Sequence, residues 1–184
     1  MVTRWRMSSP LESSASGPAR HRRFFLEVAQ ACCARLFASY GYPLAPCDPA
    51  AGAALSHFGI VGFLATGLQG SLVLGSSDEP LARSNPAKAV HVREWIGELS
   101  NQLVGRVKNQ LLPYALELRV DTPVTLRDTR MSEARTRGLP AISLQGQGGL
   151  VRCWVDLQLD RGFHMTAEPD PNRAGPQESE IVIL

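Results

Sequence analysis

The sequence predicts an α+β fold, in which an antiparallel sheet carries two long helices packed on one face. Apolar residues recur at helical spacing in two long segments, 21–41 and 87–111. Short β-prone runs separated by glycine-containing turns occupy 58–76 and 141–159. The 184 residues are 44% hydrophobic and 20% charged, which is the balance of a globular protein with one sizeable core.

Charge and hydropathy argue against several classes of function. The formal net charge of +2 is too small to indicate nucleic acid or an anionic membrane as a partner. No stretch approaches the roughly 18 apolar residues that a membrane span needs, and the arginine-containing start lacks the apolar core of a signal peptide. We therefore expect a cytoplasmic protein, although a start rich in Arg and Ser also fits a transit peptide.

The four cysteines indicate a reducing compartment and no metal site. Cys32 and Cys33 are adjacent, Cys47 and Cys153 stand alone, and none has a second cysteine or a histidine at metal-ligand spacing. We expect them to be small buried hydrophobic residues, and we expect the chain to hold no metal ion or cofactor of its own.

One domain between two tails is the expected organisation. Residues 1–20 are rich in Ser, Pro, Gly and Arg and form a predicted flexible leader. The domain is predicted to span 21–166. Residues 167–184 contain three prolines and several acids and form a predicted C-terminal tail.

The first half of the domain is predicted to be a helix followed by a β-hairpin. Residues 21–41 place their apolar side chains on one helical face, and Gly41 ends the helix. A Pro/Gly/Ala-rich loop is expected at 42–53. The β-prone runs 58–65 and 70–76 then flank a glycine turn, which predicts a hairpin.

The second half of the domain is predicted to be helical first and then β-rich. A short helix over 79–84 is followed by the most strongly periodic helix, 87–111, which Pro113 ends. The strands expected after it are 115–122, 123–129, 141–146 and 150–159.

On a helical wheel, the segment 87–111 separates an apolar stripe from a polar one. The stripe expected to face the core consists of Val92, Trp95, Ile96, Leu99, Leu103 and Val107. The opposite side consists of Glu94, Glu98, Asn101, Gly105 and Lys108. Glu98 and Asn101 are three residues apart, so we expect their Cβ atoms about 5–6 Å apart and their side chains to project together.

Two glycines flank Asn101 in this helix. Gly97 lies about one turn before Asn101 and Gly105 one turn after it, and each glycine costs about 1 kcal/mol of helix stability relative to alanine. Two explanations are open. The glycines serve close packing of the helix on the sheet or on the first helix, or they give another molecule room to approach Asn101.

These residues resemble the motif of the CheC/CheX/FliY phosphatases of bacterial chemotaxis. The family pattern has a glutamate, an asparagine three residues later and a proline further on, which Glu98, Asn101 and Pro123 match. Here 21 residues separate Asn101 from Pro123, about one fewer than in the family pattern. The pattern favours Asp or Ser where this chain has Glu94. Gly105 and the glycine-rich hairpin before the helix extend the resemblance.

The resemblance implies a CheX-like member with a single site. CheC-like members carry such a site on each long helix, whereas the first helix of this chain offers Glu27 and Gln30 with no asparagine in the matching place. Glutamine is one methylene longer and would misplace a bound water. CheX-like members often form homodimers through the sheet, so a homodimer is implied as well.

The activity implied by the resemblance is removal of the aspartyl phosphate of a phosphorylated CheY-like receiver domain. The receiver supplies its own Mg²⁺, so the main task of the phosphatase is to position an in-line water. Asn101 would orient this water, because a carboxamide both donates and accepts hydrogen bonds. Glu98 would dock the partner by pairing with the receiver's phosphate-site lysine.

The resemblance also implies roles for the residues around this pair. Glu94, Gly97 and Gly105 would belong to the partner-binding surface, and Pro123 would fix a strand end beneath the site through its locked φ. Two other functions fit the same sequence. One is a non-catalytic CheX-like binding module in a signalling pathway, and the other is a dimeric scaffold whose glycines serve packing alone.

Overall fold

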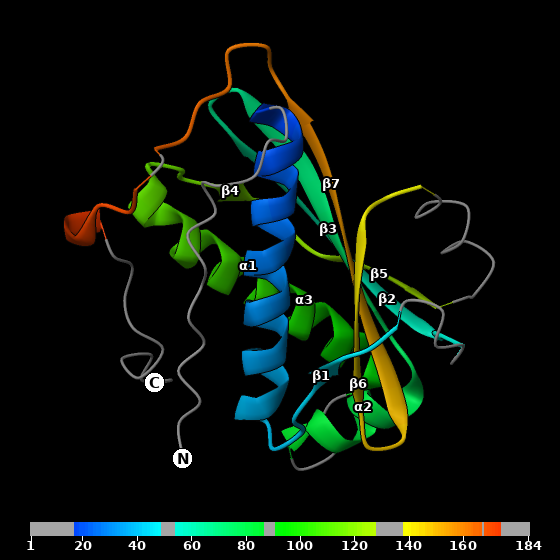
Figure 1. Cartoon of the computed structure of the whole chain (residues 1–184). Helices are drawn as coiled ribbons and strands as arrows, with labels where there is room; N and C mark the ends of the chain where they lie inside the picture. Colours follow the sequence, from blue (N-terminus) through cyan, green and yellow to red (C-terminus); the bar gives the residue numbers. More distant parts are fainter. Residues whose placement is uncertain (1–16, 49–53, 87–90, 128–137, 167, 174–184) are drawn as a thin grey trace.

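A seven-stranded antiparallel sheet with two long helices on one face organises the fold, as the sequence predicts (Figure 1). The computed structural model describes residues 17–48, 54–86, 91–127, 138–166 and 168–173. Its helices are α1 (Gly17–Ser39), α2 (Asp78–Ser84) and α3 (Val92–Leu111), with 3-10 turns η3 (Leu112–Tyr114) and η4 (Pro171–Arg173). Its strands are β1 (Ala45–Pro46), β2 (His57–Ala65), β3 (Leu68–Ser76), β4 (Arg119–Val120), β5 (Val124–Arg127), β6 (Ala141–Gly146) and β7 (Gly149–Leu159).

The strands follow the order β1-β6-β7-β3-β2-β4, and β5 also pairs with β2. The predicted hairpin is β2 and β3, whose tight turn holds Gly67 at a φ of 70°. β4 and β5 pair with successive parts of β2, so they form one edge of the sheet with a break between them. At this break the backbone N–H of Asp121 still donates to the carbonyl of Gly62 at 2.9 Å.

The main core lies between the two long helices and the sheet. α1 packs on β6, β7 and α3, whereas α3 packs on β2, β3 and β5, so the two helices cover neighbouring parts of one face (Figure 1). The largest fully buried side chains include Phe25, Phe37, Ile96, Leu99 and Leu103. Because both helices bury one stripe, their opposite faces remain for other contacts.

The start of α1 corrects the predicted boundary of the leader. The helix begins at Gly17, so residues 17–20 are helical and not part of a flexible segment. Pro18 explains the difference, since proline is well tolerated in the first helical turn, where its missing N–H leaves no bond unmade. Gly41 has a φ of 76° just after the helix, which confirms the predicted stop. Residues 1–16 lie outside the described part of the chain.

The strand predicted over 115–122 is mostly irregular. Ala115 has a left-handed φ of 60° after η3, and only Arg119–Val120 pairs with the sheet. Leu116 and Leu118 are nevertheless buried, so their alternation reflected burial without strand pairing. The predicted loop 42–53 contains the short strand β1.

Several predicted segments extend beyond the described residues. These are 87–90 of the long helix, 49–53 of the loop, 128–129 of the strand and 174–184 of the tail. Residues 168–173, from the predicted tail, return to η3, where the N–H of Asp170 donates to the carbonyl of Pro113 at 2.8 Å.

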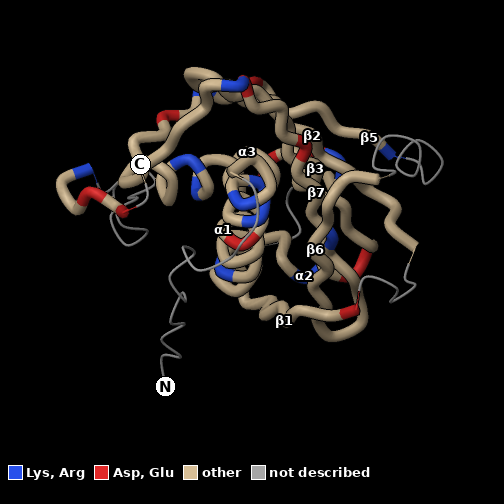
Figure 2. The backbone as a smooth tube through the Cα atoms, turned by 45° about the horizontal axis from the view of Figure 1, so that its top comes forward, with Lys and Arg blue, Asp and Glu red and all other residues tan. Residues whose placement is uncertain are grey.

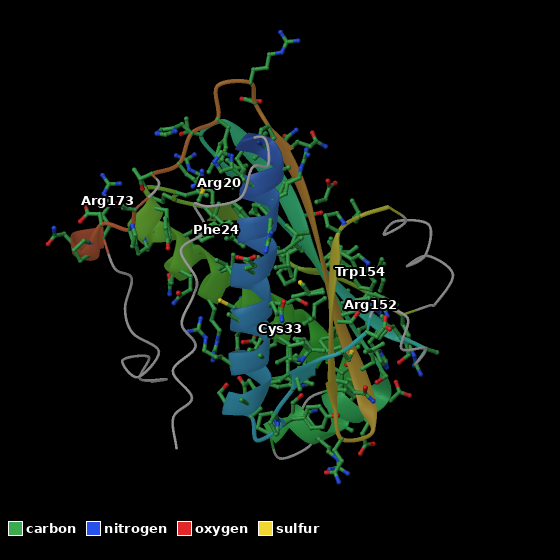
Figure 3. All side chains as sticks on the ribbon, in the orientation of Figure 1. Arg20, Phe24, Cys33, Arg152, Trp154 and Arg173 are labelled. Atoms are coloured by element: carbon green, nitrogen blue, oxygen red, sulfur yellow. The ribbon has the colours of Figure 1, made fainter. Side chains whose placement is uncertain are left out.

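A second apolar cluster covers part of the sheet face that points away from the helices. It contains Leu55, Phe58, Val73, Leu150 and Trp154. Trp154 does lie on the outward face of β7, away from α1 (Figure 3). It is only 6% exposed, because the other members of this cluster cover it.

Three of the four cysteines are buried as the sequence predicts, and Cys47 is the exception. Cys32, Cys33 and Cys153 are buried, Cys47 is half-buried, and all four are free thiols. Burial raises the pKa of Cys33 and Cys153 well above the ordinary value, so both remain protonated. Among the described residues, no helix is long and apolar enough to cross a membrane.

Candidate functional site

The outer face of α3 carries the predicted site. The predicted apolar stripe is buried, apart from the half-buried Val92 at the start of the helix. On the opposite side Glu94, Glu98 and Asn101 are exposed. The helical phase inferred from the sequence is therefore confirmed, and it brings Glu98 and Asn101 to the surface one turn apart.

Ser100 fixes the height of α3 above the sheet. Its side chain is buried, and its hydroxyl donates to the carbonyl of Ile96 at 2.7 Å. It faces Gly59 of β2, where an added Cβ would lie 2.9 Å from the Cβ of Ser100. The missing side chain at Gly59 thus lets α3 approach β2 closely, at the residue next to Asn101.

The two glycines of α3 have different surroundings. Gly97 is buried, and a Cβ there would lie 2.9 Å from Cγ2 of Thr125 on β5. Apart from its own stretch of helix, Gly105 has no described atom within 4 Å of an added Cβ. Of the two explanations for these glycines, close packing therefore fits Gly97 and open clearance fits Gly105. Gly97 is covered by β5, so its surroundings favour a role in packing over a direct contact with a partner.

Asn101 presents an unengaged carboxamide. Its side chain is exposed, and it makes no hydrogen bond to any residue in the described ranges. Both its oxygen and its nitrogen are therefore available to a water or a ligand. The buried neighbours Leu99 and Ser100 hold the backbone beneath this free group.

Glu98 is held by a contact that sequence reasoning missed. Nε2 of Gln102 donates to Oε1 of Glu98 at 2.6 Å, and the hydroxyl of Tyr40 donates to Oε1 of Gln102 at 2.9 Å. Tyr40 follows α1, so this pair of bonds connects the two long helices. The only signal in the sequence was the four-residue spacing of Glu98 and Gln102, since nothing local indicates Tyr40.

Pro123 lies at the break in the sheet edge, immediately before β5. β5 contacts α3 beside the site, where Nε of Arg93 donates to Oγ1 of Thr125 at 3.2 Å. Proline has no N–H to leave unpaired at such a break, and its fixed φ restricts the entry into β5. The predicted position of Pro123 at a strand end is confirmed, and its functional role stays a prediction.

Solved structures of chemotaxis proteins are similar to this fold. CheX from Vibrio vulnificus is 14% identical, with a TM-score of 0.59 over 73% of this chain and 99% of that one. A CheC-like protein from Shewanella sp. PV-4 is 15% identical, with a TM-score of 0.54 over 72% of this chain and 97% of that one. CheX of Borrelia burgdorferi, solved as a CheX-CheY-BeF3-Mg complex, is 13% identical, with a TM-score of 0.50 over 73% and 95%.

The chain has the fold of the CheX and CheC-like proteins. At these identities the likeness establishes the fold alone, and the function of the site depends on its own residues. The sequence matches no protein-family model and no curated protein.

Within this CheX-like fold, the first helix offers no equivalent of the α3 site. Glu27 is paired with Arg23 of the same helix at 2.9 Å, and Gln30 is half-buried. Glu98 and Glu94 form no ion pair with any described residue. The two long helices therefore differ, because only α3 presents uncompensated carboxylates together with an asparagine.

Charged side chains elsewhere in the described residues form no candidate metal site. Acidic and basic residues are scattered along the described chain (Figure 2). No group of three or more His, Cys, Asp or Glu side chains among the described residues could hold a metal ion. The exposed carboxylates of Glu94 and Glu98, together with the carboxamide of Asn101, are therefore the candidate functional site.

Proposed function

We propose that this protein removes the phosphoryl group from the aspartyl phosphate of a CheY-like receiver domain. The observation that carries the proposal is the exposed pair Glu98 and Asn101 on the outer face of α3, in a chain with the CheX fold. The proposed encounter takes place in the cytoplasm. Homodimer formation stays a prediction of the sequence resemblance.

Asn101 is the proposed catalytic residue. An aspartyl phosphate is already a reactive acyl phosphate, so hydrolysis requires mainly a water held in line with the phosphorus–oxygen bond. The carboxamide oxygen of Asn101 accepts a hydrogen bond from the water, while its N–H group donates to the water or to a phosphoryl oxygen. The water oxygen bonds to phosphorus, the bond to the aspartate oxygen breaks, and inorganic phosphate leaves.

Glu98 is proposed to dock the receiver. Its carboxylate lies one turn from Asn101 and pairs with a lysine beside the phosphorylation site, which sets the register of Asn101 over the phosphorus. The attraction strengthens as the interface excludes water. Glu94 adds a second negative charge one turn earlier, at the same exposed surface. Gly105 leaves the space that the partner's backbone needs.

The receiver is proposed to supply the Mg²⁺. The CheX-CheY-BeF3-Mg complex from Borrelia burgdorferi supports a CheY-like partner for this fold. The metal chemistry is assigned to the partner because the resemblance to the CheX-like proteins implies it. It would neutralise charge on the phosphoryl oxygens, while this chain would contribute the water and the docking contact.

The test uses receiver domains encoded in the same genome as this chain, phosphorylated with acetyl phosphate. Phosphate loss from each is followed with and without the protein. At least one receiver is expected to lose phosphate faster, and Asn101→Ala is expected to reduce the acceleration about a hundredfold. Asn109→Ala, on the same helix but two turns away, is the matched control and should retain it.

Two outcomes would contradict the assignment. If Asn101→Ala accelerates phosphate loss as well as the parent, Asn101 does not orient the water. If the parent binds a phosphorylated receiver without accelerating its decay, the protein is a binding module of the same fold. The substitution of Glu94 for the Asp or Ser that the family pattern favours is the residue difference that would fit this second function.

A further inference from the structure

Glu98 is the last member of a series of side-chain contacts that begins inside the protein. Nε1 of the buried Trp95 donates to Oγ of Ser84 at 3.0 Å. The ring of Tyr40 stands edge-on to Trp95, with 4.9 Å between centroids and 85° between planes. The Tyr40 hydroxyl donates to Oε1 of Gln102, whose Nε2 donates to Oε1 of Glu98. The exposed carboxylate is thus anchored to a buried aromatic residue.

The chemistry of this series fixes the orientation of the Gln102 amide. The carboxylate of Glu98 can only accept hydrogen bonds, so the amide N–H group of Gln102 must face it. The amide oxygen of Gln102 then accepts from the hydroxyl of Tyr40. The reversed amide would place its oxygen against a carboxylate oxygen. The two bonds also polarise each other, because the tyrosine bond makes the amide a better donor.

The effect on Glu98 is to restrict a side chain that would otherwise move freely. An exposed glutamate samples many rotamers, and fixing it costs free energy when a partner binds. Here one carboxylate oxygen is already held at 2.6 Å, which leaves Oε2 for a cation. Because the amide is neutral, Glu98 keeps its whole charge, unlike Glu27, which is paired with Arg23.

We propose that Gln102 and Tyr40 are positioning residues that hold Glu98 ready for the cationic group of the docking receiver. This inference rests on the proposed function, since it concerns the partner contact of the same site. It adds to the site a residue just after α1, Tyr40, that the Glu-x-x-Asn motif on α3 does not contain. Neither residue touches the reacting phosphoryl group, so both act on binding and leave the chemical step to Asn101.

The first test separates binding from turnover. Tyr40→Phe removes only the hydroxyl and keeps the ring against Trp95. The matched control is Tyr42→Phe, which removes the hydroxyl that donates to the carbonyl of Gln147 at 3.0 Å. The probe is the receiver domain, loaded with beryllofluoride and Mg²⁺, that this protein dephosphorylates. Tyr40→Phe is expected to weaken binding about two- to fivefold without changing the rate of phosphate loss at saturation. Tyr42→Phe is expected to change neither the binding nor this rate.

A double-mutant cycle asks whether Tyr40 acts through Glu98. In a Glu98→Gln background, Tyr40→Phe is expected to cause no further weakening, because the carboxylate that it positions is gone. Equal weakening in both backgrounds would overturn the inference. If Glu98→Gln itself leaves binding unchanged, the proposed docking role fails. If Glu98→Gln weakens binding and Tyr40→Phe does not, the docking role stands and the positioning role is wrong.

The contacts can also be tested in the free protein. The side-chain amide resonances of Gln102 are assigned in a ¹H–¹⁵N spectrum of the whole chain. Tyr40→Phe and Glu98→Gln are each expected to shift them, and Tyr42→Phe is not. Resonances that respond to neither substitution would show that the contacts are absent in solution, and the inference would fall whatever the receiver does.

Discussion

Replacing Gly105 by alanine is expected to stabilise the protein and to impair its contact with a partner at the same time. Glycine in a helix interior costs about 0.8–1.0 kcal/mol relative to alanine. An alanine Cβ at this position meets no described atom within 4 Å, so the substitution carries no packing penalty. The free energy of unfolding should therefore rise by about 0.5–1 kcal/mol, or about 1–4 °C in Tm for a chain of this size.

Gly97→Ala is the matched control in the same helix. It gains the same helix propensity, but its Cβ would lie 2.9 Å from Cγ2 of Thr125. Thr125 cannot turn away without losing the hydrogen bond from Arg93, and overpacking of this kind costs about 1–3 kcal/mol. Gly97→Ala is therefore expected to be less stable than Gly105→Ala. Thr125→Ser, which removes Cγ2 and keeps the hydroxyl, should recover most of the difference.

Urea denaturation of the parent and the variants measures these free energies directly. A Gly105→Ala variant that is less stable than the parent would show that a side chain at this position does carry a packing penalty. The same variant is next measured for binding to the receiver. If Gly105 provides clearance for a partner, the added methyl group weakens binding although the fold is more stable. Unchanged binding would assign Gly105 to neither packing nor recognition.

Three further predictions concern the rest of the molecule. Gly59→Ala should destabilise the protein by about 1–3 kcal/mol in the same urea assay, because its Cβ would collide with Ser100 and lift α3 from the sheet. A hydrogen bond from Ser56 holds the pKa of Asp78 below its ordinary value, so its carboxylate stabilises the fold at neutral pH and the contribution is lost as pH falls through the lowered pKa. Asp78→Asn should cost less than about 1 kcal/mol at pH 7, since the side chain is 81% exposed, and nothing in strong acid. Native alkylation followed by mass spectrometry should modify Cys47 alone, with the three buried cysteines reacting only after unfolding.

The helical phase of the site could be predicted from the sequence because it depends on local periodicity. The apolar stripe from Trp95 to Val107 determines which side of α3 is buried, and Glu98 and Asn101 follow from that. The β2–β3 hairpin was predictable for the same reason, since its turn needs a glycine at positive φ. Features that depend on a local sequence pattern could therefore be predicted.

Features that depend on contacts between distant segments could not be predicted from the sequence. Tyr40 and Gln102 are 62 residues apart, so no local pattern indicates that they meet. Trp154 points away from the main core by alternation along β7, and it is buried only because other segments contribute to the second apolar cluster. The same limit applies to Gly97 and Gly105, whose roles differ only because β5 lies beside one of them.

The central claim is that Asn101 orients the water that hydrolyses a receiver's aspartyl phosphate. The most direct test is the first-order rate of phosphate loss with the protein at saturating concentration, together with the affinity for the same receiver carrying beryllofluoride and Mg²⁺. Asn101→Ala is expected to bind within about twofold of the parent, while its acceleration of phosphate loss falls about a hundredfold. An Asn101→Ala variant that binds and still hydrolyses at the parental rate would contradict this claim.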